Sequence, residues 1–256
     1  MKRLSAQKKY FYPYVEGFLE ERGYGRIDTS DTFQKKTAHG FQNIYFEWNQ
    51  NHGTESSVKL WLTIRNNLIE EIKAKLAPEN TEPDKRTLFF SPMDIKELLS
   101  QENKEELFFL REFGLDGVDE SKIGPLDFHQ RFLVQHNQVY GDVIDFFKDE
   151  SIERWVNGFQ RLMEDWGMNF LDQLKTDRGI HHFLNDQILS EGYQFVAPTF
   201  KVLNTMTCGL IAAWFTNLSD FENVYSFWEE KFADEERHQF MWEIRSLRGL
   251  LEEDAT

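Results

Sequence analysis

An aliphatic side chain at every second position between residues 56 and 65 constrains the fold of this chain more than any other feature. Every second side chain in that stretch is aliphatic: Val58, Leu60, Leu62 and Ile64. Because successive side chains of a strand point to opposite faces, the pattern predicts a β-strand with one buried face. Residues 40–48 would place Ile44, Phe46 and Trp48 on one face of a strand and Phe41 and Tyr45 on the other. The turn formers Asn51 and Gly53 lie between the two stretches. The pair predicts an antiparallel hairpin, whose apolar face other elements must cover to make it stable in water.

The segments around the hairpin predict the rest of a sheet and its covering helices. Residues 5–21 carry apolar side chains at three- and four-residue steps, typical of a helix, although Pro13 should kink this helix or mark its start. Residues 28–36 predict a first strand at the edge of the sheet, and residues 86–90 predict a short last one. Residues 66–76 change to helical spacing. We therefore expect an N-terminal antiparallel sheet of about four strands with covering helices.

From residue 151 onward the apolar spacing is helical. One stripe ends at Gly167, and shorter helical pieces are expected at residues 170–174 and 180–189. Three consecutive helices are expected at residues 198–216, 219–232 and 234–251, with short connections that indicate antiparallel neighbours. Residues 126–147 fit a helix, which we favour, but residues 141–147 also fit a final strand. The predicted class is α+β, with an α+β region at residues 1–147 and an acidic helical region at 148–256, either separate or packed as a single domain.

Charge and cysteine content limit the functions open to the chain. The formal charge is −15, and it is uneven: residues 1–85 hold 13 basic and 12 acidic side chains, while the remainder holds 16 basic and 32 acidic ones. Nucleic acids and anionic membranes need positive charge at the contact, so this balance argues against both as partners. It favours a basic protein partner, although the same acidity would also keep an aromatic-rich chain in solution. The single cysteine excludes an intrachain disulfide, and without an apolar secretory leader we expect a cytoplasmic protein.

A few residues suggest metal or nucleophile chemistry. Glu235 and His238 would share one helical face, but di-iron bundles need a second copy of this spacing, which the sequence lacks. We therefore expect no metal and no cofactor, and we keep a hydrolase-like enzyme with a dispersed or metal-assisted site as the alternative function. His181 and His182 would point about 100° apart on a helix, so a capping or surface role is expected. Cys208 lies in an apolar helix, which predicts a packed thiol.

Candidate partner contacts are of two kinds. Tyr45 and Trp61 fall opposite the aliphatic rows of their strands, where we expect them to be half exposed and available to a partner. Residues 114–125 contain several glycines and are expected to form an exposed loop, whose Asp116, Asp119 and Glu120 could meet a basic surface. No phosphate-binding glycine loop, serine-nucleophile elbow, paired zinc-ligand motif or dinucleotide fingerprint occurs in the sequence, which makes an enzyme the less favoured reading.

The chain opens with a helix that ends in Arg22-Gly23-Tyr24, followed by the strand segments 31–36 and 40–46. Later, residues 149–174 contain Trp166-Gly167-Met168-Asn169-Phe170-Leu171. In this order the segments resemble a bacterial domain-of-unknown-function family of small acidic α+β proteins, some of which look like immunity proteins encoded beside polymorphic toxins. The resemblance rests on structural motifs and implies no functional residue. Together with the charge distribution, it favours a non-catalytic interaction protein that neutralises a basic effector such as a toxin domain.

Overall fold

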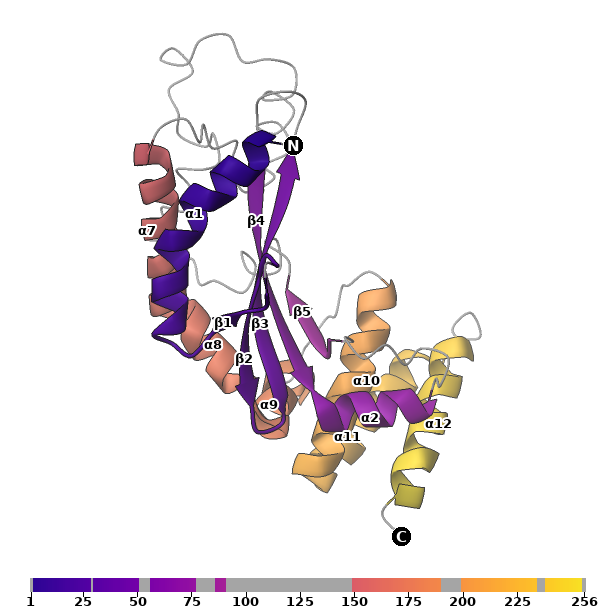
Figure 1. Ribbon diagram of the computed structural model, residues 1–256. Helices are drawn as coiled ribbons and strands as arrows, with labels where there is room; N and C mark the ends of the chain where they lie inside the picture. The colour runs from indigo at the N-terminus through magenta and orange to yellow at the C-terminus, as the bar shows by residue number, and fades with distance from the viewer. Residues whose placement is uncertain are drawn as a thin grey trace, which may run out of the picture. The chain divides into compact units, whose positions relative to one another are not determined.

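The structure is a computed structural model that describes residues 2–28, 30–50, 56–76, 86–90, 149–189, 199–233 and 238–254. Within these residues the fold is α+β, as predicted (Figure 1). Five strands form an antiparallel sheet in the order β1-β2-β3-β4-β5, and the C-terminal region is mostly helical. The expectations for residues 114–125 and 126–147 lie outside the described residues.

The predicted hairpin is confirmed as the centre of this sheet. The strands are β1 Gly25–Arg26, β2 Thr32–Thr37, β3 Gly40–Gln50, β4 Ser56–Asn66 and β5 Leu88–Phe90. The aliphatic row of β4 is buried at all four positions, and on β3 Ile44 and Phe46 are fully buried. The period of two therefore identified both the strands and the face that the core covers.

The predicted edge strand at residues 28–36 is wrong in its start and its place. Asp28 has a left-handed backbone (φ 49°), and the amide of Ile27 donates to the carbonyl of Thr32, so the chain turns here. The edge strand is the two-residue β1, which pairs with β2 so that Gly25 faces Gln34. Residue 28 therefore belongs to the turn of a small hairpin and not to a strand.

The helices include α1 Lys2–Glu20, α2 Asn67–Leu76, α7 Asp149–Leu162, α8 Met168–Gln173, α9 Asp177–Leu189, α10 Thr199–Thr216, α11 Leu218–Lys231 and α12 His238–Asp254, with the π-helical turn η3 Met163–Gly167 between α7 and α8. Of the described helices, none has the length and apolar content needed to cross a membrane.

The helix boundaries suggested by Pro13 and Gly167 differ from the predicted ones. Of the two alternatives at Pro13, a helix start near the proline is excluded, because α1 begins at Lys2 and contains Pro13, with Phe11 and Val15 buried on either side of it. Gly167 does not end a helix; it lies in η3, and the helical path continues directly into α8. A Cβ at Gly167 would lie 2.6 Å from Met163 Sδ, so the glycine allows this close approach within the π turn.

The chain forms two compact units. Unit 1 comprises Met1–Lys35, Asn43–Thr63 and Phe89–Asn169, and unit 2 comprises Lys36–Gln42, Ile64–Leu88 and Phe170–Thr256. In unit 1, helix α1 packs beside α7 (Figure 1). Phe11 of α1 contacts Phe46 of β3 edge-to-face, with ring centroids 5.2 Å apart. In unit 2, helix α10 packs against α2, α9, α11 and α12 and is buried from Met206 to Ala213. Each unit therefore has a core of its own.

Candidate functional site

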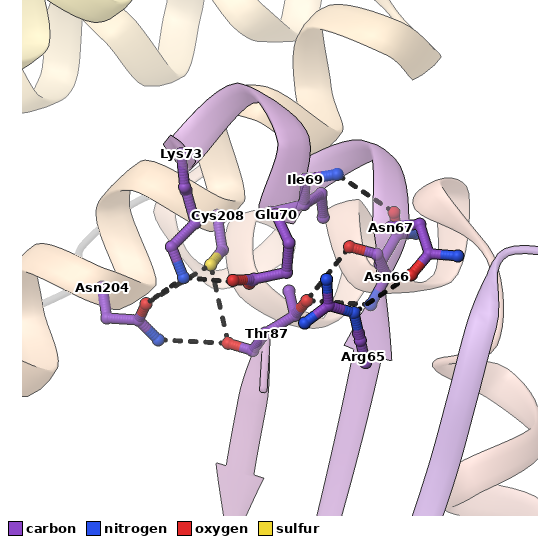
Figure 2. Close-up of polar contacts among 9 residues, drawn as sticks. All are labelled: Arg65, Asn66, Asn67, Ile69, Glu70, Lys73, Thr87, Asn204 and Cys208. Atoms are coloured by element: carbon purple, nitrogen blue, oxygen red, sulfur yellow. Dashed lines mark hydrogen bonds and ion pairs between the residues drawn. The ribbon is translucent and has the colours of Figure 1, made fainter. Parts of the chain in front are cut away.

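A buried polar network in unit 2 joins the β4–α2 junction to the residue before β5 (Figure 2). Asn66 ends β4, and its Oδ1 accepts the amide of Ile69 at 3.2 Å, which caps the start of α2. The hydroxyl of Thr87 accepts from the Asn66 amide at 2.8 Å and donates to the Asn66 carbonyl at 3.3 Å. The side-chain amide of Asn66 donates to Asp177 Oδ1 at 2.5 Å. One asparagine thus fixes the ends of two elements and reaches the start of α9.

The same network contains a buried ion pair that also contacts α10. Lys73 Nζ donates to Glu70 Oε1 at 3.0 Å and to Asn204 Oδ1 at 2.9 Å, and the Glu70 side chain is only 4% exposed. Asn204 Nδ2 donates to the Thr87 carbonyl at 3.1 Å, and Cys208 Sγ lies 3.6 Å from the same oxygen. Figure 2 shows these contacts as one continuous chain of side chains from α2 to α10. Within unit 2, helix α10 is therefore held to α2 and to Thr87 by polar contacts.

Burial and neighbouring side chains together set the protonation states in this network. It raises the pKa of the Cys208 thiol to about 11, with Lys73 acting in the lowering direction and Glu70 in the raising one. For Lys73, burial opposes the charged form, but Cys208 and Glu70 favour it, and the pKa of the amine lies above its ordinary value. At neutral pH the lysine is charged and the cysteine is a thiol, so neither is a ready nucleophile. The predicted packed thiol is confirmed.

His181 lies in a second buried network, which corrects the expected capping or surface role. It is 1% exposed, with Nε2 3.1 Å from Asp220 Oδ2 on α11 and Nδ1 2.8 Å from Asn185 Nδ2. Asn185 Nδ2 also donates to the Gly209 carbonyl on α10 at 2.9 Å, so the amide is a donor on this side and Nδ1 accepts. The imidazole then donates to Asp220 through Nε2, and both ring nitrogens are engaged. His182, by contrast, is exposed and pairs with Asp186.

Gly209 is the sequence signal that could have found this network. A Cβ at Gly209 would lie 2.6 Å from Asn185 Oδ1, so only glycine allows α10 to approach α9 this closely. The residues that complete the network come from α9, α10 and α11, which no local pattern connects. A glycine in an otherwise apolar helix indicates close packing, but it does not name the partner.

An aromatic platform lies in unit 1, on the strand face opposite the aliphatic row. We use this name for Trp61, Phe89 and the adjoining Glu47. The rings of Trp61 and Phe89 are stacked, with centroids 4.7 Å apart and planes inclined by 28°, and Phe89 is 46% exposed. Trp61 Nε1 donates to Glu47 Oε2 at 2.7 Å, and Lys59 Nζ lies 4.0 Å from Glu47 Oε1. The platform combines an accessible ring surface with a carboxylate.

The platform contains one predicted partner residue, Trp61, and one that sequence reasoning missed, Phe89. Tyr45 and Trp61 are half-buried, which confirms the exposure expected of them; their contact with a partner stays a prediction. The exposure of Phe89 was not predicted, because Leu88, Phe89 and Phe90 are all apolar and the sequence shows no alternation there. In the structure Leu88 and Phe90 are buried and Phe89 is exposed, the alternation of a strand.

The two arginines of helix α12 form ion pairs with carboxylates of the acidic helices α11 and α12. Arg248 makes a two-pronged contact with Glu222, with both N–O distances at 3.0 Å, and also donates to Glu252 at 2.9 Å. Arg245 pairs with Glu229 at 3.3 Å. Helix α11 is capped by Asn217, whose side chain accepts the amide of residue 219, and not by a residue within the helix. The arginines of α12 are thus matched by carboxylates of the same two helices.

The remaining predicted site residues are not placed. Asp116, Asp119 and Glu120 lie outside the described residues, as do Glu235 and the side chain of His238. Within the described ranges, no group of three or more His, Cys, Asp or Glu side chains is arranged to hold a metal ion. No protein-family model, curated protein or solved structure matches the chain.

Proposed function

We propose that this chain is a non-catalytic protein-interaction protein, most concretely a bacterial, cytoplasmic, immunity- or antitoxin-like protein that neutralises a basic effector by covering it. The segregation of charge along the chain carries this proposal. Residues 1–85 are nearly neutral, whereas the residues from 218 to 256 include eleven acidic and four basic side chains. An acidic surface of this kind steers a basic protein toward it and selects it over acidic competitors.

The ion pairs of α11 and α12 support the same proposal. Arg245 and Arg248 together occupy three carboxylates, so they do not cancel the acidic excess of these helices. Glu230 and Glu253 are exposed. Exposed carboxylates such as these contribute to the long-range field that speeds association with a basic partner.

The buried networks of unit 2 also support a non-catalytic protein. Lys73 is charged, Cys208 is a thiol, and both nitrogens of His181 are hydrogen-bonded within the protein. A general base or a nucleophile needs a free lone pair that a substrate can reach. These three groups instead hold helices to one another.

The experiment begins with capture of the partner from the native host by the tagged chain. Association rates are then measured by stopped-flow at several ionic strengths for the wild type and for Glu230→Gln/Glu253→Gln. We expect the variant to associate about two- to fivefold more slowly at low salt and to match the wild type near 1 M salt, where charges are screened within about 3 Å. The effector's activity should disappear at one equivalent of this chain.

Glu20→Gln/Glu71→Gln is the matched control, because it removes the same charge from exposed positions in the nearly neutral part of the chain. Its association rate should stay close to that of the wild type. An acidic partner, equal slowing by both variants, or turnover of the captured molecule would contradict the proposal. The loop predicted at residues 114–125 is tested in parallel by converting Asp116, Asp119 and Glu120 to their amides, which should also slow association without changing the melting temperature.

A further inference from the structure

We draw no further inference here: the strongest candidate, the surface of helix α12 around the exposed side chain of Trp242 in unit 2, carries nothing, because nothing in the structure shows what covers it.

Discussion

Alkaline pH should destabilise this protein through one buried thiol. The Cys208 side chain is fully buried, and burial raises its pKa from 9.0 to about 11. The folded state therefore holds the thiol proton more tightly than the unfolded state does. Stabilisation from this group is complete below about pH 9 and is lost as the pH rises through about 11. A difference of two pKa units corresponds to about 3 kcal/mol, which we take as the upper limit of the loss.

The measurement is urea unfolding followed by circular dichroism, at steps from about pH 8 to about pH 11, for the wild type and Cys208→Ala. Burial also raises the pKa of Tyr12 and Tyr225 above their ordinary value, and both tyrosines are present in both proteins. The difference between the two proteins therefore isolates Cys208 together with its coupling to Lys73. We expect the stability advantage of the wild type to shrink by about 2 to 3 kcal/mol over this range. Parallel stability curves for the two proteins would refute the reasoning.

Three further substitutions test the core, the buried ion pair and a glycine. Leu62→Asp should cost about 4 kcal/mol or prevent folding, because it places a charge at a fully buried position of β4; a thermal melt measures this. Lys73→Met should cost about 3 kcal/mol by leaving Glu70 buried without its cation, and adding Glu70→Leu should recover much of the loss. Gly40→Ala should cost about 2 kcal/mol or more, because φ is +154° and a Cβ would lie 2.1 Å from the Arg65 carbonyl oxygen.

Each of these substitutions has a control or a refuting outcome. Leu62→Met keeps the position apolar and should cost less than about 1.5 kcal/mol. If Lys73→Met and the double variant are equally destabilised, the ion pair does not carry the effect. Gly249→Ala, at an open and exposed position in α12, should stabilise the helix by up to about 1 kcal/mol. A melt of Gly40→Ala equal to that of the wild type would contradict the crowding described at the β3 start.

Most of the fold could be predicted where one face of an element is buried along its whole length. Alternation located β3 and β4 because every second side chain enters the core. The edge strand β1 was missed because two residues carry no period, and its position depends on the left-handed turn at Asp28. A start of α1 near Pro13, one of the two alternatives, was wrong because tertiary burial of residues on both sides of the proline outweighs a local helix breaker.

The candidate sites were harder to predict because they depend on contacts between distant elements. Cys208 was assigned correctly, since a run of apolar neighbours is enough to indicate burial. His181 was not, because its partner Asp220 reaches it only when α11 packs against α9. Exposure of Trp61 followed from strand period alone, whereas the stacking of Phe89 on it required the pairing of β5 with β4. The period of apolar residues predicts which face of a strand or helix is buried, but it does not predict which elements pack against each other.

The division of the strands between the two units has a consequence for synthesis on the ribosome. Unit 1 is not complete until residue 169 has been made, and unit 2 combines Lys36–Gln42 and Ile64–Leu88 with the segment that begins at Phe170. The nascent chain therefore carries the long hairpin, with its aliphatic row, before much of either unit exists. Exposed apolar strands of this kind are what chaperones bind during translation. A cut after residue 169 would not release a self-sufficient fragment, because it would separate unit 2 from the strand ends that it shares with the hairpin.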